Sequence, residues 1–300
     1  MDMTQNKCCR HGASLRRRRR RRRKILCFII FSCSIIAVAV FVAVGSSMIR
    51  SGDGRTNRYD VEARNNTYDN AVIENSKISE KNKIQNNQSM LDDIMNSTQY
   101  PKQLKDLALK NEEALEFVYD YPAEHVKEHT IDLTEEASMD SVPLFVQWDK
   151  RWGYEKYSGN FFAASGCGPT TLSMVVVYLT HNRDASPIAV AKYSKEAGYS
   201  VDGSGSSWTL ISEGCRHYGV KAKTVALDES RMKAELDAGH PIVINVGPGD
   251  FTDTGHFMVI TGYDDEGFSI NDPNSIEKSG KRWLFRNISS QIRAVWSMYV

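Results

Sequence analysis

The chain has 300 residues, 41% of them hydrophobic and 10% aromatic, which is the composition of an ordinary globular protein with room for one or two domains. Its formal charge of +1 is unevenly placed, because residues 1–50 hold 12 Lys and Arg against one Asp and residues 51–300 carry a net charge of −10. This acidic balance excludes a broad nucleic-acid-binding surface on residues 51–300, so no nucleic-acid partner is expected.

A basic run followed by an apolar run opens the chain. Residues 16–24 read RRRRRRRRK, and residues 25–44 are apolar apart from two serines and two cysteines. A helix of about twenty residues spans about 30 Å, the thickness of a bilayer core. Because basic residues stay on the cytoplasmic side, we predict a cytoplasmic tail at 1–24, a transmembrane signal-anchor helix at 25–47 and the rest of the chain outside the cell.

Two other interpretations of this region stay open. The small residues of AVGSS, directly after the apolar run, suit a signal-peptidase site, and cleavage there would release a secreted protein. The arginine run by itself also fits a nucleic-acid-binding arm. The length of the apolar run favours the uncleaved anchor. It predicts a single-pass protein of the cell membrane, in a Gram-positive bacterium, with the lipid bilayer as the partner of residues 25–47.

Two segments of different character follow the apolar run. Residues 48–98 are polar, rich in Asn, Ser, Lys and Asp, and lack a sustained apolar period, which predicts a disordered stalk. Residues 99–140 have apolar side chains at helical spacing and Asn111 as a cap for a second short helix, which predicts a helical lead-in packed on the next domain. These apolar positions are Leu104, Leu107, Ala108, Leu115 and Val118.

A compact domain is predicted at residues 141–300. It begins with an extended segment, VPLFVQWDKRWG, and continues with the apolar run TLSMVVVYL, which predicts a buried helix over 171–179. Further helices are predicted from Ser186, over 207–218 and after the N-cap Asp228. Strands are predicted at 221–227, 241–247, 256–263, 267–272 and 293–300. Helices first and an antiparallel sheet second define an α+β fold.

Cys167 is a candidate nucleophile in the segment AASGCGPTTLSM, residues 163–174. A cysteine in the first turn of a helix is close to unpaired N–H groups and to the positive end of the helix dipole, which favour thiolate over thiol. Gly166 and Gly168 are expected to allow a sharp turn and an open approach to the sulfur. Pro169 suits the first turn because it has no N–H group to leave unsatisfied.

A nucleophile of this kind needs a base, and the base needs an orienting partner. His256 opens the apolar strand HFMVITGY, and Asp272 ends the next strand. An odd-length hairpin loop would put both side chains on one face of the sheet. With Gly267 in a three-residue loop, however, His256 would lie opposite Ile276. Contact with Asp272 therefore requires another even register, a bulge or strong twist.

The motifs in this order resemble those of the C39-like cysteine peptidases, a branch of the papain-like fold related to the leader peptidase domains of bacteriocin exporters. The matching pieces are PLFVQWDKRWGYEKY, SGCGPTTLSM, PGDFTDTGHFMVITGYDDEGFSINDPNS and RAVWSMY. The resemblance implies Cys167 as nucleophile, His256 as general base and acid, Asp272 as the group that holds the imidazole, and Gln147 as oxyanion donor. It also implies a peptide or protein substrate, cleaved through a thioester.

Gln147 fits the oxyanion role chemically, since it is a neutral amide among apolar neighbours. The backbone N–H of Cys167 is the expected second donor. No HExxH or paired CxxC spacing is present, so neither a metal nor another cofactor is expected.

Other functions stay open at this point. The chain lacks the transporter region of leader-processing relatives, so cytosolic leader cleavage is disfavoured. The same residues fit a cell-wall peptide amidase or endopeptidase, or a catalytically weak peptide-binding module. A disulfide between Cys167 and Cys215 is a structural alternative. Cys215 shares a predicted helix face with Leu210, Ile211 and Tyr218, which favours a buried thiol.

Overall fold

The computed structural model of the protein describes residues 79–300. The predicted cytoplasmic tail (1–24), the predicted membrane helix (25–47) and residues 48–78 of the predicted stalk lie outside the described residues. Within 79–300, no helix combines the length and the apolar character that a membrane span requires.

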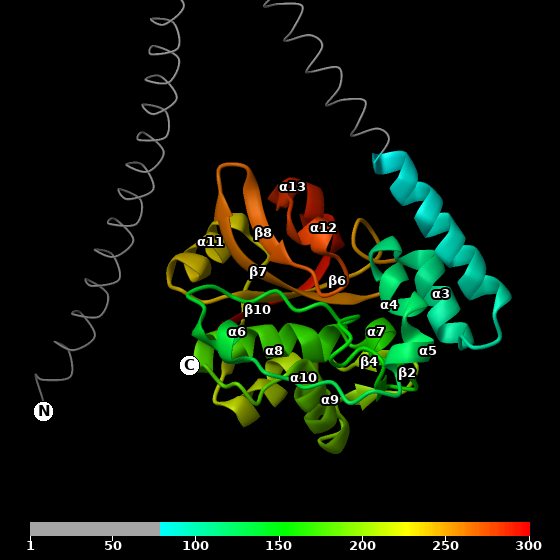
Figure 1. The fold of residues 1–300 in the computed structure, drawn as a ribbon. Coiled ribbons are helices and arrows are strands. Elements are labelled where there is room, and N and C mark those ends of the chain that lie inside the picture. Colours follow the sequence, from blue (N-terminus) through cyan, green and yellow to red (C-terminus); the bar gives the residue numbers. More distant parts are fainter. Residues whose placement is uncertain (1–78) are drawn as a thin grey trace, which may run out of the picture. The chain divides into compact units, whose positions relative to one another are not determined.

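A six-stranded antiparallel sheet, with strand order β5-β10-β6-β7-β8-β9, lies at the centre of the described domain (Figure 1). All of β6 and the first five residues of β7 are buried, as their apolar sequences predict. The strand bounds are β5 Lys221–Thr224, β6 Ile242–Val246, β7 His256–Asp264, β8 Gly267–Asn271, β9 Arg282–Trp283 and β10 Ile292–Tyr299.

Helices cover both faces of this sheet (Figure 1). The buried helix α8 packs on one face and contacts α9, α10 and η3, whereas α11 and α13 pack on the other face and α12 lies against β8. The bounds are α8 Cys167–Thr180, α9 Pro187–Glu196, α10 Thr209–Ser212, η3 Gly214–Tyr218, α11 Glu229–Asp237, α12 Ile276–Ser279, α13 Phe285–Ile288 and η4 Ser289–Gln291.

The alternation of side chains along the strands produces these two layers. On β7, Val259 joins a core cluster with Met174 of α8, whereas the next residue, Ile260, joins a second cluster with Met232 of α11. Helices and an antiparallel sheet therefore combine as predicted for an α+β domain, and helices cover both faces of the sheet.

Two local features differ from the prediction. The helix predicted over 207–218 is divided into α10 and η3, because Glu213 between them leaves the helical region, with φ −126° and ψ −46°. Five two-residue strands are additional, since such short strands have no periodic pattern to recognise. One is β9, at the edge of the central sheet, and the other four form two hairpins, β1 Lys156–Tyr157 with β2 Asn160–Phe161 and β3 Ser200–Val201 with β4 Gly205–Ser206.

Short helices occupy the segment predicted as the lead-in. The five predicted apolar positions of this segment are all buried in one cluster. Asn111 accepts a hydrogen bond from the Glu113 N–H and so caps η2, as its sequence position predicts. The bounds are α3 Lys102–Lys110, η2 Glu112–Ala114, α4 Leu115–Tyr119, α5 Tyr121–Glu124 and α6 Thr134–Ser138.

Residues 79–96 form a helix, where the sequence predicted part of a disordered stalk. Ile94 is fully buried in the same cluster as Leu104, and Met90 and Leu91 pack against that cluster. These three apolar residues share one helix face. Their contacts with the following helices supply the stability that the polar composition of the segment does not reveal.

Candidate active site

Cys167 is the first residue of α8, directly after the N-cap residue Gly166. Cys167 as a residue is partly exposed, whereas the next ten residues of the helix are buried. Because the first N–H groups of a helix lack intrahelical acceptors, the sulfur lies beside partial positive charge. Pro169 lies in this first turn, as predicted.

The glycines on either side of Cys167 are required for packing. Gly166 separates α7 from α8 with φ −84°, outside the left-handed region, so its backbone conformation does not by itself require glycine. A Cβ atom on Gly166 would lie 2.6 Å from the Phe162 ring, and one on Gly168 would lie 2.5 Å from Ser206 Oγ. Real side chains do not approach this closely, so both neighbours exclude any larger residue.

The hairpin of β7 and β8 brings His256 and Asp272 together. Its loop has two residues, because Asp264 pairs with Gly267, and not the three that the sequence suggested. The register then shifts between Ile260 and Gly262, which makes Thr261 an extra residue, a β-bulge. Beyond the bulge, Val259 pairs with Asn271. If this register continues, Asp272 lies two positions along the strand from the residue opposite His256, on the same face of the sheet.

His256 and Asp272 form a buried hydrogen-bonded pair. His256 Nε2 lies 2.6 Å from Asp272 Oδ1, and both side chains are more than 90% buried. The same carboxylate oxygen accepts the Asn274 N–H at 2.8 Å. With Nε2 used by the carboxylate, Nδ1 is the ring nitrogen left for a thiol proton.

The pKa values of the cysteine and histidine are shifted in opposite directions. Burial favours a high thiol pKa, but hydrogen bonding and charge from His256, with N–H groups of Phe257 and Gly168, outweigh it and lower the pKa of Cys167. For His256, burial opposes the charged form, while Asp272 and Cys167 favour it and raise its pKa to about 10. Both shifts favour the charged form of each group, which is a thiolate beside an imidazolium.

A hydrogen bond fixes α8 to β7 next to this pair. Thr171, one helical turn after Cys167, donates from its buried hydroxyl to the carbonyl of Phe257, the neighbour of His256, at 3.0 Å. The helix that carries the thiol and the strand that carries the imidazole are therefore attached to each other close to both groups.

Gln147 lies buried beside the turn that precedes Cys167. Its Nε2 donates to the carbonyl of Ala163 at 2.7 Å and, over a longer distance of 3.3 Å, to Asn274 Oδ1. Its Oε1 has no hydrogen-bond partner among the described residues. Gln147 is thus held between α7 (Phe162–Ser165) and the loop after β8. Its contact with Asn274 is the weaker of the two.

Cys167 and Cys215 are both free thiols, so the alternative disulfide is not formed. Cys215 is fully buried in η3, and burial raises its pKa to about 11. The two thiols therefore have opposite reactivity, since only the thiolate is a nucleophile. In residues 79–300, no group of three or more His, Cys, Asp or Glu side chains has the geometry of a metal site.

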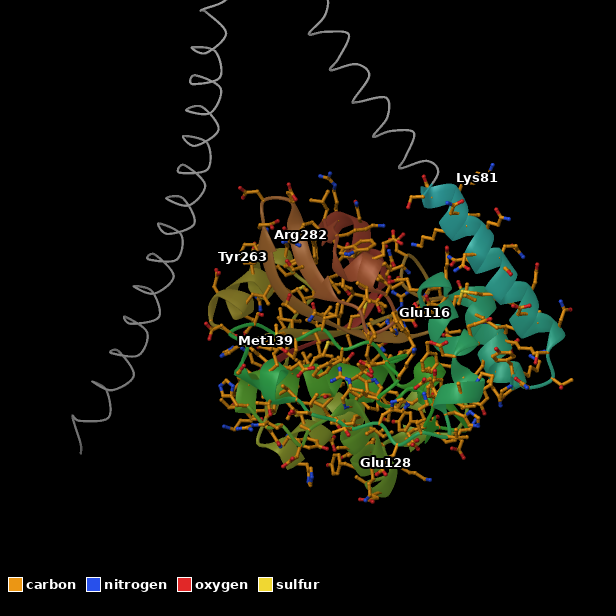
Figure 2. The ribbon with its side chains drawn as sticks, in the orientation of Figure 1. Lys81, Glu116, Glu128, Met139, Tyr263 and Arg282 are labelled. Atoms are coloured by element: carbon orange, nitrogen blue, oxygen red, sulfur yellow. The ribbon has the colours of Figure 1, made fainter. Side chains whose placement is uncertain are left out.

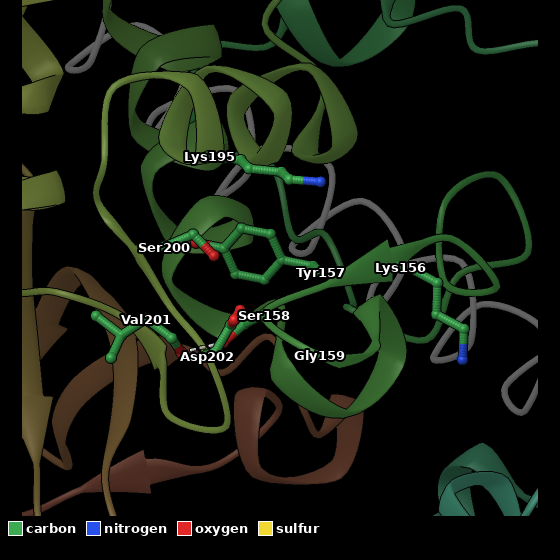
Figure 3. Close-up of a pocket in the computed structure, with 8 residues that line it drawn as sticks. All are labelled: Lys156, Tyr157, Ser158, Gly159, Lys195, Ser200, Val201 and Asp202. Carbon is green, nitrogen blue, oxygen red and sulfur yellow. Dashed lines mark hydrogen bonds between the residues drawn. The ribbon is translucent and has the colours of Figure 1, made fainter.

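A cavity of about 430 Å³ lies beside the β1–β2 hairpin (Figure 3). It is lined by Lys156, Tyr157, Ser158, Gly159, Lys195, Ser200, Val201 and Asp202, and by none of the four predicted site residues. Tyr157 connects this cavity to the cysteine region, because its hydroxyl bonds Ser206 Oγ at 2.6 Å and Ser206 packs on Gly168.

Sequence reasoning missed three polar residues around the site. Asn274 contacts Gln147, and Asn111 and Glu113 contact the loop that carries Asp272 and Asn274. Asn274 belongs to the motif NDPNS, and this motif was the sequence signal that could have identified it as a site residue. No local signal points to Asn111 or Glu113, because their contacts with the loop join positions more than 160 residues apart.

Comparisons with known proteins gave one family match and similar solved structures. The model of the Peptidase_C39 like family matches residues 139–300. The peptidase domain of Streptococcus ComA, described as a bi-functional ABC transporter involved in a quorum sensing pathway, is 19% identical with a TM-score of 0.37. That match covers 45% of this chain and 90% of the ComA domain.

A Bacillus anthracis protein described as a C39-like peptidase is 18% identical with a TM-score of 0.33. This match covers 56% of the chain and 97% of the Bacillus protein. A search of curated proteins gave no match.

Proposed function

Since the chain belongs to the C39-like peptidase family, we propose that it is a cysteine peptidase that hydrolyses peptide bonds with Cys167, His256 and Asp272. One observation carries the proposal: the thiol of the partly exposed residue at the start of α8 interacts with an imidazole whose Nε2 lies 2.6 Å from a buried carboxylate. This is the arrangement that activates a thiol nucleophile in a papain-like site.

In the proposed acylation step, the Cys167 thiolate attacks the peptide carbonyl and a C–S bond forms. The His256 imidazolium gives its proton to the leaving amine as the C–N bond breaks, which leaves a thioester. Asp272 stabilises the imidazolium before the transfer and keeps the ring in one orientation.

Water completes the proposed cycle. Neutral His256 removes a proton from the water as its oxygen attacks the thioester carbonyl. The C–S bond then breaks, the acid product leaves and the thiolate and imidazolium are restored. Each step uses only groups in the chain and one water molecule.

We assign Gln147 as one donor to the oxyanion and the Cys167 N–H as the other. The 2.7 Å bond to Ala163 and the longer contact with Asn274 hold the amide in place, and the N–H group of the longer contact is the one that would also donate to the substrate oxygen. A single side-chain donor of this kind contributes about 10²–10³-fold to kcat.

Active-site labelling tests the chemistry. We expect iodoacetamide at pH 7 to modify Cys167 and not Cys215, because of the two cysteines in residues 79–300 only Cys167 has a lowered pKa. Mass mapping identifies the labelled residue, and Cys215 is the control within the same molecule. Absence of label at Cys167 under reducing conditions would overturn the proposal, as would equal casein hydrolysis by wild type and Cys167→Ala.

The substrate is identified by comparing a protein with cell-wall peptides. Wild type and Cys167→Ala are incubated with casein and with purified muropeptides, and new amino groups are counted. We expect Cys167-dependent release from casein. Release from muropeptides alone would instead establish a wall amidase or endopeptidase. Peptide binding without release from either would establish a binding module.

We also propose that residues 25–47 anchor the protein in the cell membrane with residues 51–300 outside the cell. The twenty apolar residues after the arginine run support this placement. Expression of the full chain in a Gram-positive host, followed by alkaline extraction of membranes, tests it. We expect the protein in the membrane pellet, and a shortened form in the medium would instead indicate signal cleavage.

A further inference from the structure

One loop supports both the imidazole and the candidate oxyanion donor. This loop, residues 272–277 and called here the site loop, carries Asp272, which holds His256, and Asn274, which contacts Gln147. Its last two residues, Ile276 and Glu277, are the first two residues of α12. Its position therefore determines the position of two proposed functional side chains.

Glu113, from the helices before the family domain, binds one end of the site loop. Its Oε1 accepts the hydroxyl of Ser275 in a short hydrogen bond, and its Oε2 accepts the N–H groups of Ile276 at 2.7 Å and Glu277 at 3.1 Å. Three donors on one carboxylate make a charge-assisted clamp.

Ser275 passes this constraint to Asp272. The Ser275 N–H donates to the Asp272 carbonyl at 3.2 Å, and Ser279 of α12 accepts the Asp272 N–H at 2.9 Å. Ser275, which Glu113 contacts, thus holds the carbonyl of Asp272, and Ser279, later in α12, holds its N–H group.

Asn111 binds the middle of the same loop. Its Nδ2 donates to the Asn274 carbonyl at 2.9 Å and to Asn274 Oδ1 at 3.1 Å, while its own Oδ1 accepts the Glu113 N–H. Because Asn274 Oδ1 also accepts from Gln147, the orientation of the Asn274 amide is set from both sides.

We propose that Asn111 and Glu113 are positioning residues of the peptidase site, Glu113 acting through Asp272 on His256 and Asn111 acting through Asn274 on Gln147. This inference rests on the proposed function. Neither residue lies in the segment that the family model matches, residues 139–300. The helices before the family domain thus supply part of the support of its active site.

The first test measures the pH dependence of Cys167 alkylation in Glu113→Ala and Glu113→Gln. The titratable groups that face the Cys167 and His256 pair are Asp272 from the site loop and Tyr157 from β1. When the clamp is lost, Asp272 holds the imidazolium less firmly. We expect the ascending limb of Glu113→Ala to move up by about one pH unit, which is about a tenfold slower reaction below the limb.

Glu113→Gln is the conservative variant. Its amide keeps one oxygen for the loop N–H groups and offers a donor to Ser275, so most of the wild-type profile should return. Glu116, labelled in Figure 2, is an exposed glutamate of α4, and Glu116→Ala should behave as wild type.

The second test uses Asn111→Asp, which keeps the oxygen that caps η2 but removes both donors to Asn274. Alkylation forms no oxyanion, whereas peptide hydrolysis does. We therefore expect casein hydrolysis to fall about tenfold more than alkylation, because only hydrolysis depends on Gln147.

The outcomes separate this inference from the proposed function. If wild type is not alkylated at Cys167, the proposed function is wrong and the inference fails with it. If wild type reacts but Glu113→Ala and Asn111→Asp change only the melting temperature, the two residues are merely structural and the inference alone is overturned.

Discussion

His256 Nε2 lies 2.6 Å from Asp272 Oδ1 across the β7–β8 hairpin, although these strands have a loop of two residues and not the three that the sequence suggested. The bulge at Thr261 restores the parity that the shorter loop would remove. One extra residue in β7 thus decides whether the imidazole has a carboxylate partner.

Removal of the Asp272 carboxylate should lower activity strongly. Asp272→Ala removes the charge that raises the pKa of His256, so the imidazolium is lost more easily and the Cys167 pKa rises. We expect kcat/KM on a casein-derived peptide to fall about 10²–10⁴-fold. Asp272→Asn should lose less, because its oxygen still accepts the His256 N–H.

Asp228→Ala is the matched control for Asp272. Asp228 caps α11 through the Arg231 N–H, so its loss should cost about 1 kcal/mol of folding stability and leave the peptidase rate unchanged. Equal rates for wild type and Asp272→Ala would contradict the assigned role of Asp272.

The pH dependence of hydrolysis and of alkylation should differ. Below the lowered pKa of Cys167 the thiol is protonated, so both reactions should rise as the pH passes this value, which lies below the ordinary thiol pKa of 9.0. Above the pKa of His256, about 10, the proton for the leaving amine is gone, so hydrolysis alone should fall.

A bell-shaped hydrolysis profile beside a sigmoidal alkylation profile is therefore expected, measured on the same preparation. An alkylation limb at an ordinary thiol pKa would contradict the ion pair. His256→Ala should move the limb upward, because the hydrogen bond and the charge of His256 that lower the pKa of the Cys167 thiol are lost.

Gln147→Ala should reduce kcat with little change in alkylation. Loss of one oxyanion donor lowers kcat by about 10²–10³-fold, whereas alkylation needs no such donor. Gln291→Ala removes another buried glutamine, whose Nε2 bonds Asp250 and whose Oε1 accepts the Asp250 N–H, and serves as the control. If both variants lose the same fraction of kcat, Gln147 has no specific role.

The regular parts of the fold follow from local sequence patterns. The apolar runs predict β6, β7 and α8. Ser186 caps the helix that was predicted to start there, and Asp228 caps α11 as predicted. These predictions succeed because periodicity and capping depend on neighbouring residues.

The contacts that assemble the candidate site are of another kind. The His256 and Asp272 contact depends on a bulge that no residue type in HFMVITGY announces. The contacts of Asn111 and Glu113 with the site loop arise only after the preceding helices have packed on the domain. The type of each group was therefore predictable, but its geometry was not, because tertiary packing determines loop and bulge positions.

The contact of Gly168 with Ser206 gives a stability prediction independent of the chemistry. A Cβ atom on Gly168 would lie 2.5 Å from Ser206 Oγ and 2.7 Å from its Cβ, so Gly168→Ala should destabilise the fold by about 1–3 kcal/mol. Gly262→Ala, where a Cβ meets nothing within 4 Å, is the control and should change stability much less.

Ser206→Gly tests the cause of this effect. It removes both atoms that the added methyl group of Gly168→Ala would meet, and with them the Ser206 hydrogen bond to Tyr157. In a double-mutant cycle followed by urea unfolding, Gly168→Ala should therefore destabilise Ser206→Gly less than it destabilises wild type. Additive losses would mean that Ser206 does not exclude the side chain. The glycine at this position would then be explained by access to the Cys167 thiol, and Gly168→Ala would slow alkylation without unfolding the protein.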